Sequence, residues 1–185
     1  VAKLKALGFS NVRAEPYTMP VWVRGEEAAR ILSPFPQNLV LAALGNSGST
    51  PAKGIEGEIV YFPSIDALEA APAASVKGKI AFVDHGMKAT QDGSSYGYFG
   101  AARRQGPSIA SKKGAIAILI RSIGTDHHRV PHTGVQMWAD GATPIPAAAL
   151  SVPDAEQLAR VVKRGQPVKV HLTLTSKMLK DQPSG

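Results

Sequence analysis

The residues best suited to chemistry are the acid and the three histidines of one short polar segment: Asp126, His127, His128 and His132. Zinc accepts both imidazole and carboxylate ligands, and the spacing of His128 and His132 is that of a zinc-binding pair on one helical turn. Pro131 disfavours helix in the residue before it, and no glutamate lies inside the pair. The favoured interpretation is therefore structural or contact histidines. A stand-alone metal-dependent hydrolase built on this segment is the alternative.

No other pattern assembles a catalytic group. Residues 45–49, Gly-Asn-Ser-Gly-Ser, follow an apolar stretch as a nucleophile elbow would, but Ser49 stands where that elbow needs glycine. The chain has no cysteine, which excludes thiol nucleophiles, disulfides and Cys-ligated zinc. Nothing in the spacing places a serine beside a histidine. A Ser-His-Asp triad is consequently not indicated.

A short helix and a buried strand must position the histidine segment. Residues 107–113 are expected to be helical, with Pro107 at the first turn and Gly114 as the left-handed residue that closes the helix. Residues 115–120 carry no polar side chain, which is typical of a strand buried on both faces. This strand leads into a polar loop over residues 121–136. We expect Arg121 either to meet a substrate carboxylate through paired hydrogen bonds or to anchor the loop internally.

The rest of the chain predicts short strands alternating with helices. Strands are expected at residues 39–44, 59–61, 80–83, 144–150 and 168–174, an extended segment at 12–22, helices at 1–7, 64–70 and 153–164, and a brief helical turn at 25–32. Ser64 and Ser151 suit the N-cap position of their helices. This mixture favours an α/β or α+β layered domain.

Composition narrows the class of protein. The 185 residues suffice for one domain of ordinary size, and 44% hydrophobic residues suffice for a packed core. No apolar run is long enough to span a bilayer. The net charge of +7 lies entirely in residues 93–185, which hold twelve Lys/Arg against five Asp/Glu, whereas residues 1–92 hold nine of each. These basic residues come as isolated pairs with little aromatic interleaving, which favours a solvated or protein-docked face over a nucleic-acid surface.

Several stretches carry a family resemblance. They are Pro20-Val-Trp-Val-Arg-Gly-Glu-Glu-Ala28, Gly48-Ser-Thr-Pro51 with Gly54-Ile55, Lys113-Gly-Ala-Ile-Ala-Ile-Leu-Ile-Arg-Ser122, Pro131-His-Thr-Gly-Val-Gln136, Ile145-Pro146 and Pro153-Asp-Ala155. Together they resemble the protease-associated (PA) domain inserted in M28-family zinc peptidases, close to the carboxypeptidase Q branch. The similarity runs over about residues 11–180.

The resemblance implies a fold and a division of the chain. The implied fold is a small open β-barrel or sandwich flanked by helices. Residues 1–10 would be the tail of a peptidase-domain helix, residues 11–175 the PA domain, and residues 176–185 a linker returning to a peptidase domain that this chain does not contain.

The resemblance also implies a role without chemistry of its own. In the family, two zinc ions are held by a His-x-Asp motif and further residues that follow this insert, and no His-x-Asp occurs in this sequence. The chain is thus expected to be a non-catalytic lid or interaction module, without a cofactor, of a secreted or periplasmic M28 amino- or carboxypeptidase. Its expected partners are the peptidase domain of the same polypeptide and a peptide substrate, with no nucleic acid and no membrane span. The candidate contact residues are Arg121, Ser122, Asp126, His127, His128, His132 and Gln136.

Overall fold

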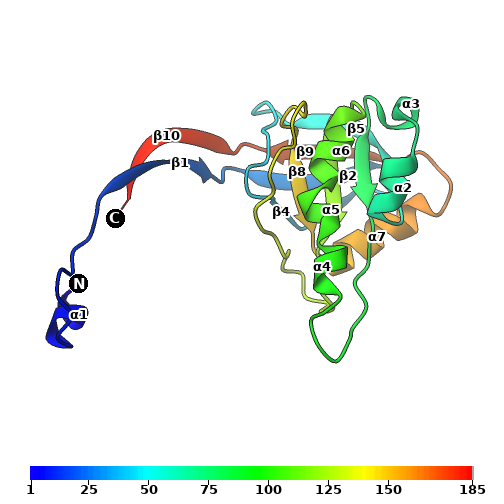
Figure 1. Cartoon of the computed structure of the whole chain (residues 1–185). Coiled ribbons are helices and arrows are strands. Elements are labelled where there is room, and N and C mark those ends of the chain that lie inside the picture. The colour runs from blue at the N-terminus through cyan, green and yellow to red at the C-terminus, as the bar shows by residue number, and fades with distance from the viewer. Residues whose placement is uncertain (185) are drawn as a thin grey trace.

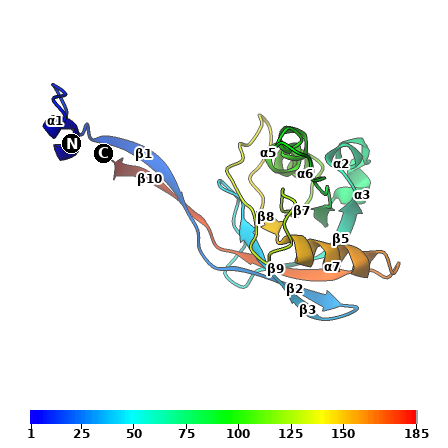
Figure 2. The ribbon, with the colours of Figure 1, turned by 90° about the horizontal axis from the view of Figure 1, so that it is seen from below.

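An eight-stranded sheet forms the body of the molecule and curls into a nearly closed barrel (Figures 1 and 2). The structure is a computed structural model that describes residues 1–184. The strand order is β3 (Gln37–Leu39), β2 (Glu27–Ser33), β9 (Lys169–Leu174), β5 (Ile55–Phe62), β6 (Ile80–Val83), β7 (Ala117–Arg121), β8 (Ala147–Leu150) and β4 (Leu41–Ala43). Strands β5 to β8 are mutually parallel, and the other pairs are antiparallel. The predicted mixed α/β barrel is confirmed.

The parallel strands are buried on both faces because helices or other strands cover each side. Phe82 and Leu119 point into one apolar cluster, which lies inside the barrel and also includes side chains of α7 (Val152–Val162). Their neighbours Val83 and Ile118 point into a second cluster, under the helices of the outer face. Alternate residues of one short apolar strand thus serve two cores, as the run at residues 115–120 predicts.

The outer-face helices lie in the connections between parallel strands (Figure 2). They are α2 (Ile65–Ala70), α3 (Ala73–Val76), α4 (Tyr96–Phe99), α5 (Ala101–Arg104) and α6 (Gly106–Lys112). Ser64 caps α2 by accepting a hydrogen bond from the amide of Ala67, and Ser151 caps α7 by accepting one from Asp154. Gly114, after α6, adopts a φ of +79°, so the left-handed helix end expected there is confirmed.

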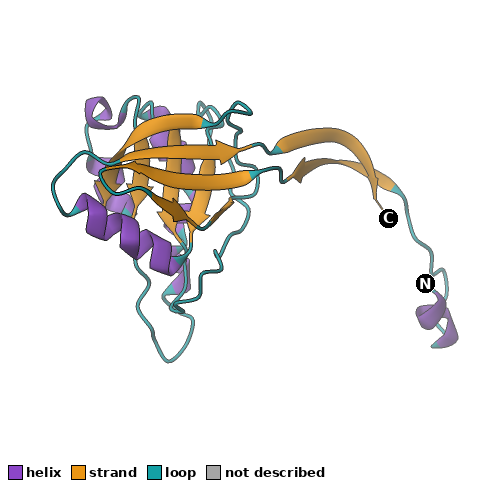
Figure 3. Ribbon diagram, turned by 180° about the vertical axis from the view of Figure 1, so that it is seen from behind, coloured by secondary structure: helices purple, strands orange, loops and turns teal. Residues whose placement is uncertain are grey.

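A two-stranded ribbon projects from the body and carries both described ends of the chain (Figures 1 and 3). Strand β1 (Tyr17–Val23) pairs antiparallel with β10 (Lys177–Ser184) over this ribbon. Beyond β1 lies α1 (Ala2–Ala6), the predicted N-terminal helix, which buries no residue. The ribbon and α1 curve toward the side of the body on which the loops after β6 and β7 project (Figure 1).

Two expectations about these elements are corrected by the structure. The helical turn expected at residues 25–32 is wrong, because Ala29 and Ile31 of β2 point into the barrel while β3 and β9 flank the strand. The strand expected at residues 39–44 is divided between β3 and β4. The segment from residue 176, expected as a returning linker, is mostly strand β10, which pairs with β1, and this pairing does not decide where the segment leads. Its last residue, Gly185, lies outside the described residues.

Candidate contact surface

Arg121 lies at the carboxyl end of β7, beside the carboxyl end of β6. Its Nε donates a hydrogen bond to Oδ1 of Asp84 at 2.6 Å, and its Nη1 donates to Oε1 of Glu156 at 3.4 Å. The side chains of Arg121 and Asp84 are only 14% and 8% exposed. Tyr61 donates from its hydroxyl to the other oxygen of Asp84 at 3.1 Å. Burial, reinforced by the Asp84 charge, raises the pKa of Tyr61, so the hydroxyl keeps its proton.

The charged groups of this cluster are paired with one another within the fold. The guanidinium is shared between two carboxylates of the same chain, which favours the anchoring role of Arg121 over the capture of a substrate carboxylate. The pairing also explains why a charged residue ends so apolar a strand: a buried cation is tolerated only when it is paired and hydrogen-bonded.

A hollow of about 260 Å³ opens above this cluster. Its lining consists of Gly86, Met87, Ala89, Arg121, Gly124, Thr125, Asp126, His127, Val152 and Glu156. The hollow brings together three of the seven predicted contact residues, Arg121, Asp126 and His127. Because the lining holds the carboxylates of Asp126 and Glu156 and the single guanidinium of Arg121, the hollow suits a small polar or cationic group.

Ser122 and His132 tie the loop of residues 121–136 to the body. Ser122 is buried, donates from Oγ to the carbonyl of Leu150 at 2.6 Å, and accepts from the amide of His132 at 2.8 Å. The His132 Nε2 lies 2.8 Å from the hydroxyl of Tyr96, which also accepts a hydrogen bond from Arg103 at 2.9 Å. Ser122 therefore positions the loop from inside, and His132 connects it to α4 and α5.

Arg129 provides a second electrostatic attachment of this loop. Its guanidinium donates to both carboxylate oxygens of Asp154, at 3.0 and 2.7 Å. Burial alone would raise the pKa of Asp154, but hydrogen bonds from Arg129 and Ser151 outweigh it and lower that pKa. The carboxylate thus accepts hydrogen bonds both from the hydroxyl of Ser151, the N-cap residue of α7, and from the loop residue Arg129. The sequence did not indicate this link between the helix and the loop.

The histidine segment is not gathered around a common point. Asp126 accepts a hydrogen bond from the amide of His128 at 3.2 Å, and Nδ1 of His127 lies 3.9 Å from Glu156. His132 turns instead to Tyr96. Within residues 1–184 no group of three or more His, Cys, Asp or Glu side chains could hold a metal ion. The metal-dependent hydrolase on Asp126, His127, His128 and His132 therefore lacks its ligand geometry.

Gln136 points inward and is only 1% exposed. Its amide nitrogen donates to the carbonyl of Asn46 at 3.2 Å, and its backbone N–H donates to Gly45 at 3.1 Å. Its position fixes the end of the loop against the segment after β4.

A larger groove, which the sequence analysis missed, lies directly beyond Gln136. It measures about 730 Å³ and is lined by Pro20, Trp22, Asn46, Ser47, Gly48, Ser49, Met137, Trp138, Pro144, Ser176, Lys177 and Met178. No signal in the sequence places Trp22 and Trp138 together. The structure does so at the base of the ribbon, where both indoles bond to consecutive carbonyls after β4.

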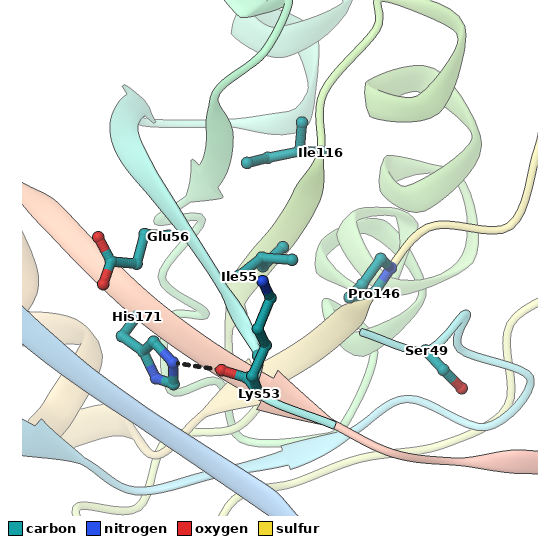
Figure 4. A pocket seen from close by; sticks show the side chains of 8 residues that line it. Ser49, Lys53, Ile55, Glu56, Ile116, Pro146 and His171 are labelled. Atoms are coloured by element: carbon teal, nitrogen blue, oxygen red, sulfur yellow. Dashed lines mark hydrogen bonds between the residues drawn. The ribbon is translucent and has the colours of Figure 1, made fainter. Parts of the chain in front are cut away.

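Another hollow, of about 560 Å³, lies at the amino ends of the parallel strands and contains none of the predicted residues (Figure 4). His171 donates from Nε2 to the carbonyl of Lys53 at 2.9 Å, and Glu56 is paired with Lys169 at 2.8 Å. The Lys53 side chain runs past Ile55 (Figure 4). Because His171 and Glu56 are already bonded within the fold, this hollow offers less chemistry than its size suggests.

The chain is similar in sequence to vertebrate carboxypeptidase Q. It is 35% identical to the mouse protein over 177 residues, which are 96% of this chain and 36% of that protein, and the human protein gives the same values. The chain thus spans about a third of the length of these relatives. No family model matches it.

Solved structures agree with this similarity. A peptidase M28 precursor from Shewanella amazonensis superimposes with a TM-score of 0.91 at 47% identity, covering all of this chain and 42% of that one. An aminopeptidase from Aneurinibacillus superimposes with a TM-score of 0.61 at 16% identity, which shows a common fold alone.

Proposed function

Because this chain is a homologue of M28-family peptidases of the carboxypeptidase Q branch over almost its whole length, we propose that it is the PA domain of such a peptidase. In this role it is a non-catalytic module that covers or shapes the entrance to the active site of a peptidase domain in the same polypeptide. The proposal rests on the sequence alignment, which covers nearly all of this chain but only about a third of the length of relatives named as peptidases.

The ribbon supports this role as a connection. Strands β1 and β10 leave the body side by side, so a domain attached to them receives the chain and returns it at neighbouring points (Figure 3). In this proposal residues 1–10 belong to a helix of the peptidase domain, and residues 176–185 lead back to it. A two-stranded ribbon is at best marginally stable alone in water, which fits one that packs against a neighbouring domain.

The anchored loop supports the proposed contact with the peptidase cleft. Arg121, Ser122 and Arg129 hold residues 121–136 rigidly on the side toward which the ribbon curves (Figure 1). Asp126, His127 and His128 are exposed on that loop. We assign them to contact with the peptidase domain or with the peptide entering its cleft.

The proposal extends to the parent protein. Its two zinc ions would lie in the peptidase domain, and secretion or export to the periplasm is part of the same proposal. No helix within residues 1–184 has the length and apolar character that crossing a membrane requires.

The test compares the 185-residue chain with the complete peptidase. The chain alone is expected to cleave none of the peptides that the complete enzyme cleaves. In the complete enzyme, replacing Asp126, His127 and His128 by serine is expected to change KM for peptides while leaving the zinc content unaltered. As a matched control, serine replacements of Lys77 and Lys79, on the opposite side of the chain's fold, are expected to leave KM unchanged. Peptide hydrolysis by the purified chain alone would refute the proposal.

A further inference from the structure

The two faces of the ribbon differ in what the chain itself places against them. Trp22 lies opposite Met178 in the register of β1 and β10, and paired residues share a face while successive residues alternate between faces. Pro20, Trp22 and Met178 accordingly lie on one face, and all three line the groove that the ribbon forms with the body. This face of the ribbon therefore already has neighbours within the chain.

The opposite face of the ribbon is apolar and exposed. It consists of every second residue of β1, together with the residue of β10 that pairs with Val21: Tyr17, Met19, Val21, Val23 and Leu179. Tyr17 is 55% exposed and Met19 39%. The register shift between Met19 and Val21 sets three steps of β10 against two of β1, so the alternation along β1 is unbroken. The solvated face of an antiparallel strand pair carries polar residues, so this apolar face is typical of a contact with another protein surface.

Other exposed apolar side chains lie on the same part of the chain. Within residues 1–184, nine of the fourteen large hydrophobic side chains that are exposed belong to residues 1–23 or to β10. They include Leu4 of α1, a helix that buries none of its residues, and Phe9, which follows that helix. One protein surface that meets both α1 and the ribbon would cover them together.

Hydrogen bonds at the base of the ribbon fix the direction in which this face points. The amide of Glu26 donates to Oγ1 of Thr175 at 2.7 Å, and the amide of Thr175 donates to the carbonyl of Glu26 at 3.0 Å. Arg24 donates from Nη1 to the carbonyl of Ala43 at 2.7 Å, and its guanidinium lies 5.1 Å from the centre of the Trp22 ring. Because both strands are held where they join the body, the face is preorganised, and docking it costs little conformational entropy.

We infer that this apolar face of the ribbon packs against the peptidase domain of the same polypeptide and holds the present domain beside it in one orientation. The inference rests on the proposed function, which supplies the peptidase domain. About two thirds of the length of the relatives lies outside the part that this chain matches, and in the proposed arrangement that part is joined to the far end of the ribbon (Figure 3).

This attachment favours the peptidase domain over other occupants of the face. A domain tethered at the ribbon has a high effective concentration there, whereas a second copy of the chain must bind from dilute solution. The consequence for function is that the present domain is a fixed wall of the cleft entrance and does not swing on the ribbon.

Single cysteines measure which face is covered, because the 185 residues contain none. In the complete peptidase, Met19→Cys and its matched control Thr18→Cys place a thiol on opposite faces of the same exposed strand. Maleimide labelling, located by peptide mapping, is expected to be at least about tenfold slower at position 19 than at position 18, because exposing one buried apolar side chain costs at least that factor. Each rate is divided by the rate in the urea-unfolded enzyme, which removes differences in intrinsic reactivity.

Two further measurements accompany this pair. Val23→Cys lies on the same face as Met19 and is expected to give the same slow labelling, so the result does not depend on one variant that fails to fold. In the 185-residue chain alone, which lacks the peptidase domain, positions 18 and 19 are expected to react at similar rates.

Three outcomes would overturn the inference. They are equal rates at positions 18 and 19 in the complete peptidase, slow labelling at position 19 in the 185-residue chain alone, and protection that is lost when the complete enzyme is diluted. The second would assign the cover to this chain, and the third to a second copy. All three leave the proposed function standing. Peptidase activity of the isolated chain would instead refute the proposed function, and labelling of the complete polypeptide would still decide whether the ribbon is covered.

Discussion

Replacing Arg121 by methionine removes the guanidinium that neutralises Asp84 at the carboxyl ends of β6 and β7. Asp84 is 8% exposed, and in this variant it keeps only the hydroxyl of Tyr61 as a side-chain partner among residues 1–184. Removing one member of a buried ion pair costs about 3–5 kcal/mol, because the other charge stays buried without compensation. Since Arg121 itself is 14% exposed, we expect a loss near the lower end, about 3 kcal/mol.

The double variant Arg121→Met with Asp84→Asn separates this cause from lost packing. Asparagine removes the buried charge and can still accept the hydrogen bond from Tyr61. We expect it to recover at least about 1.5 kcal/mol of the loss, which is the coupling expected between directly bonded charges.

Urea unfolding followed by circular dichroism measures these changes. With an m-value of about 2 kcal/mol per molar urea, the single variant is expected to unfold about 1.5 M earlier than the unaltered chain. Arg160→Met is the control, because Arg160 is 62% exposed and its nitrogen lies 3.9 Å from Glu156; we expect a change within about 0.5 kcal/mol. If Arg121→Met is as stable as this control and the double variant recovers nothing, Arg121 is not an internal anchor, and its guanidinium is available for a substrate carboxylate.

The remaining predictions concern the loop, the outer face and the basic surface. Asp154→Ala is expected to cost about 2 kcal/mol through the lost ion pair with Arg129 and the lost hydrogen bond from the Ser151 hydroxyl. Because the pKa of Asp154 is lowered in the fold, its contribution to stability is present above about pH 4 and is lost as the pH falls through the folded-state pKa. The urea midpoints of the variant and the unaltered chain should therefore converge in acid. Burial lowers the pKa of His85 despite the opposing charge of Asp66. As the pH falls, the unfolded state therefore takes up a proton before the folded state does, and the free energy of unfolding is expected to decrease below about pH 6.5. In His85→Phe, melting temperatures recorded from pH 7.5 to 5.5 should depend less on pH than those of the unaltered chain. DNA is expected to show no binding to the chain at low salt in a fluorescence-anisotropy titration, and binding that weakens steeply as salt rises would contradict the solvated basic face.

The sequence predicted the helices and strands that are determined by neighbouring residues in the chain. The strand at residues 115–120 and the helix before it followed from a wholly apolar run, Pro107 and Gly114, and Ser64 and Ser151 cap helices where expected. These signals depend on neighbouring residues, so they can be read from a single sequence.

The elements that the sequence did not predict depend on distant partners. In β2, Ala29 and Ile31 point into the barrel because β3 and β9 pair with the strand on either side. The sequence of β2 does not by itself reveal these partners. The polar segment of β10 becomes a strand because β1 offers it a pairing edge, and β-structure is governed more by context than by composition.

The candidate contact surface was likewise predicted only in part. The sequence identified the loop of residues 121–136, but whether each polar side chain faces inward or outward depends on partners far along the chain: Asp84 and Glu156 for Arg121, Leu150 for Ser122, and Asn46 for Gln136. The groove lined by Trp22 and Trp138 had no local signal, because these two residues meet only where the ribbon joins the barrel.

Zinc binding by the purified 185-residue chain tests the central claim most directly. Isothermal titration of the metal-free chain with zinc, together with elemental analysis of the chain as purified, is expected to give well under one zinc per chain and no nanomolar site. Stoichiometric zinc bound at nanomolar affinity, and lost when His128 is replaced by alanine, would contradict the account of this chain as a non-catalytic module.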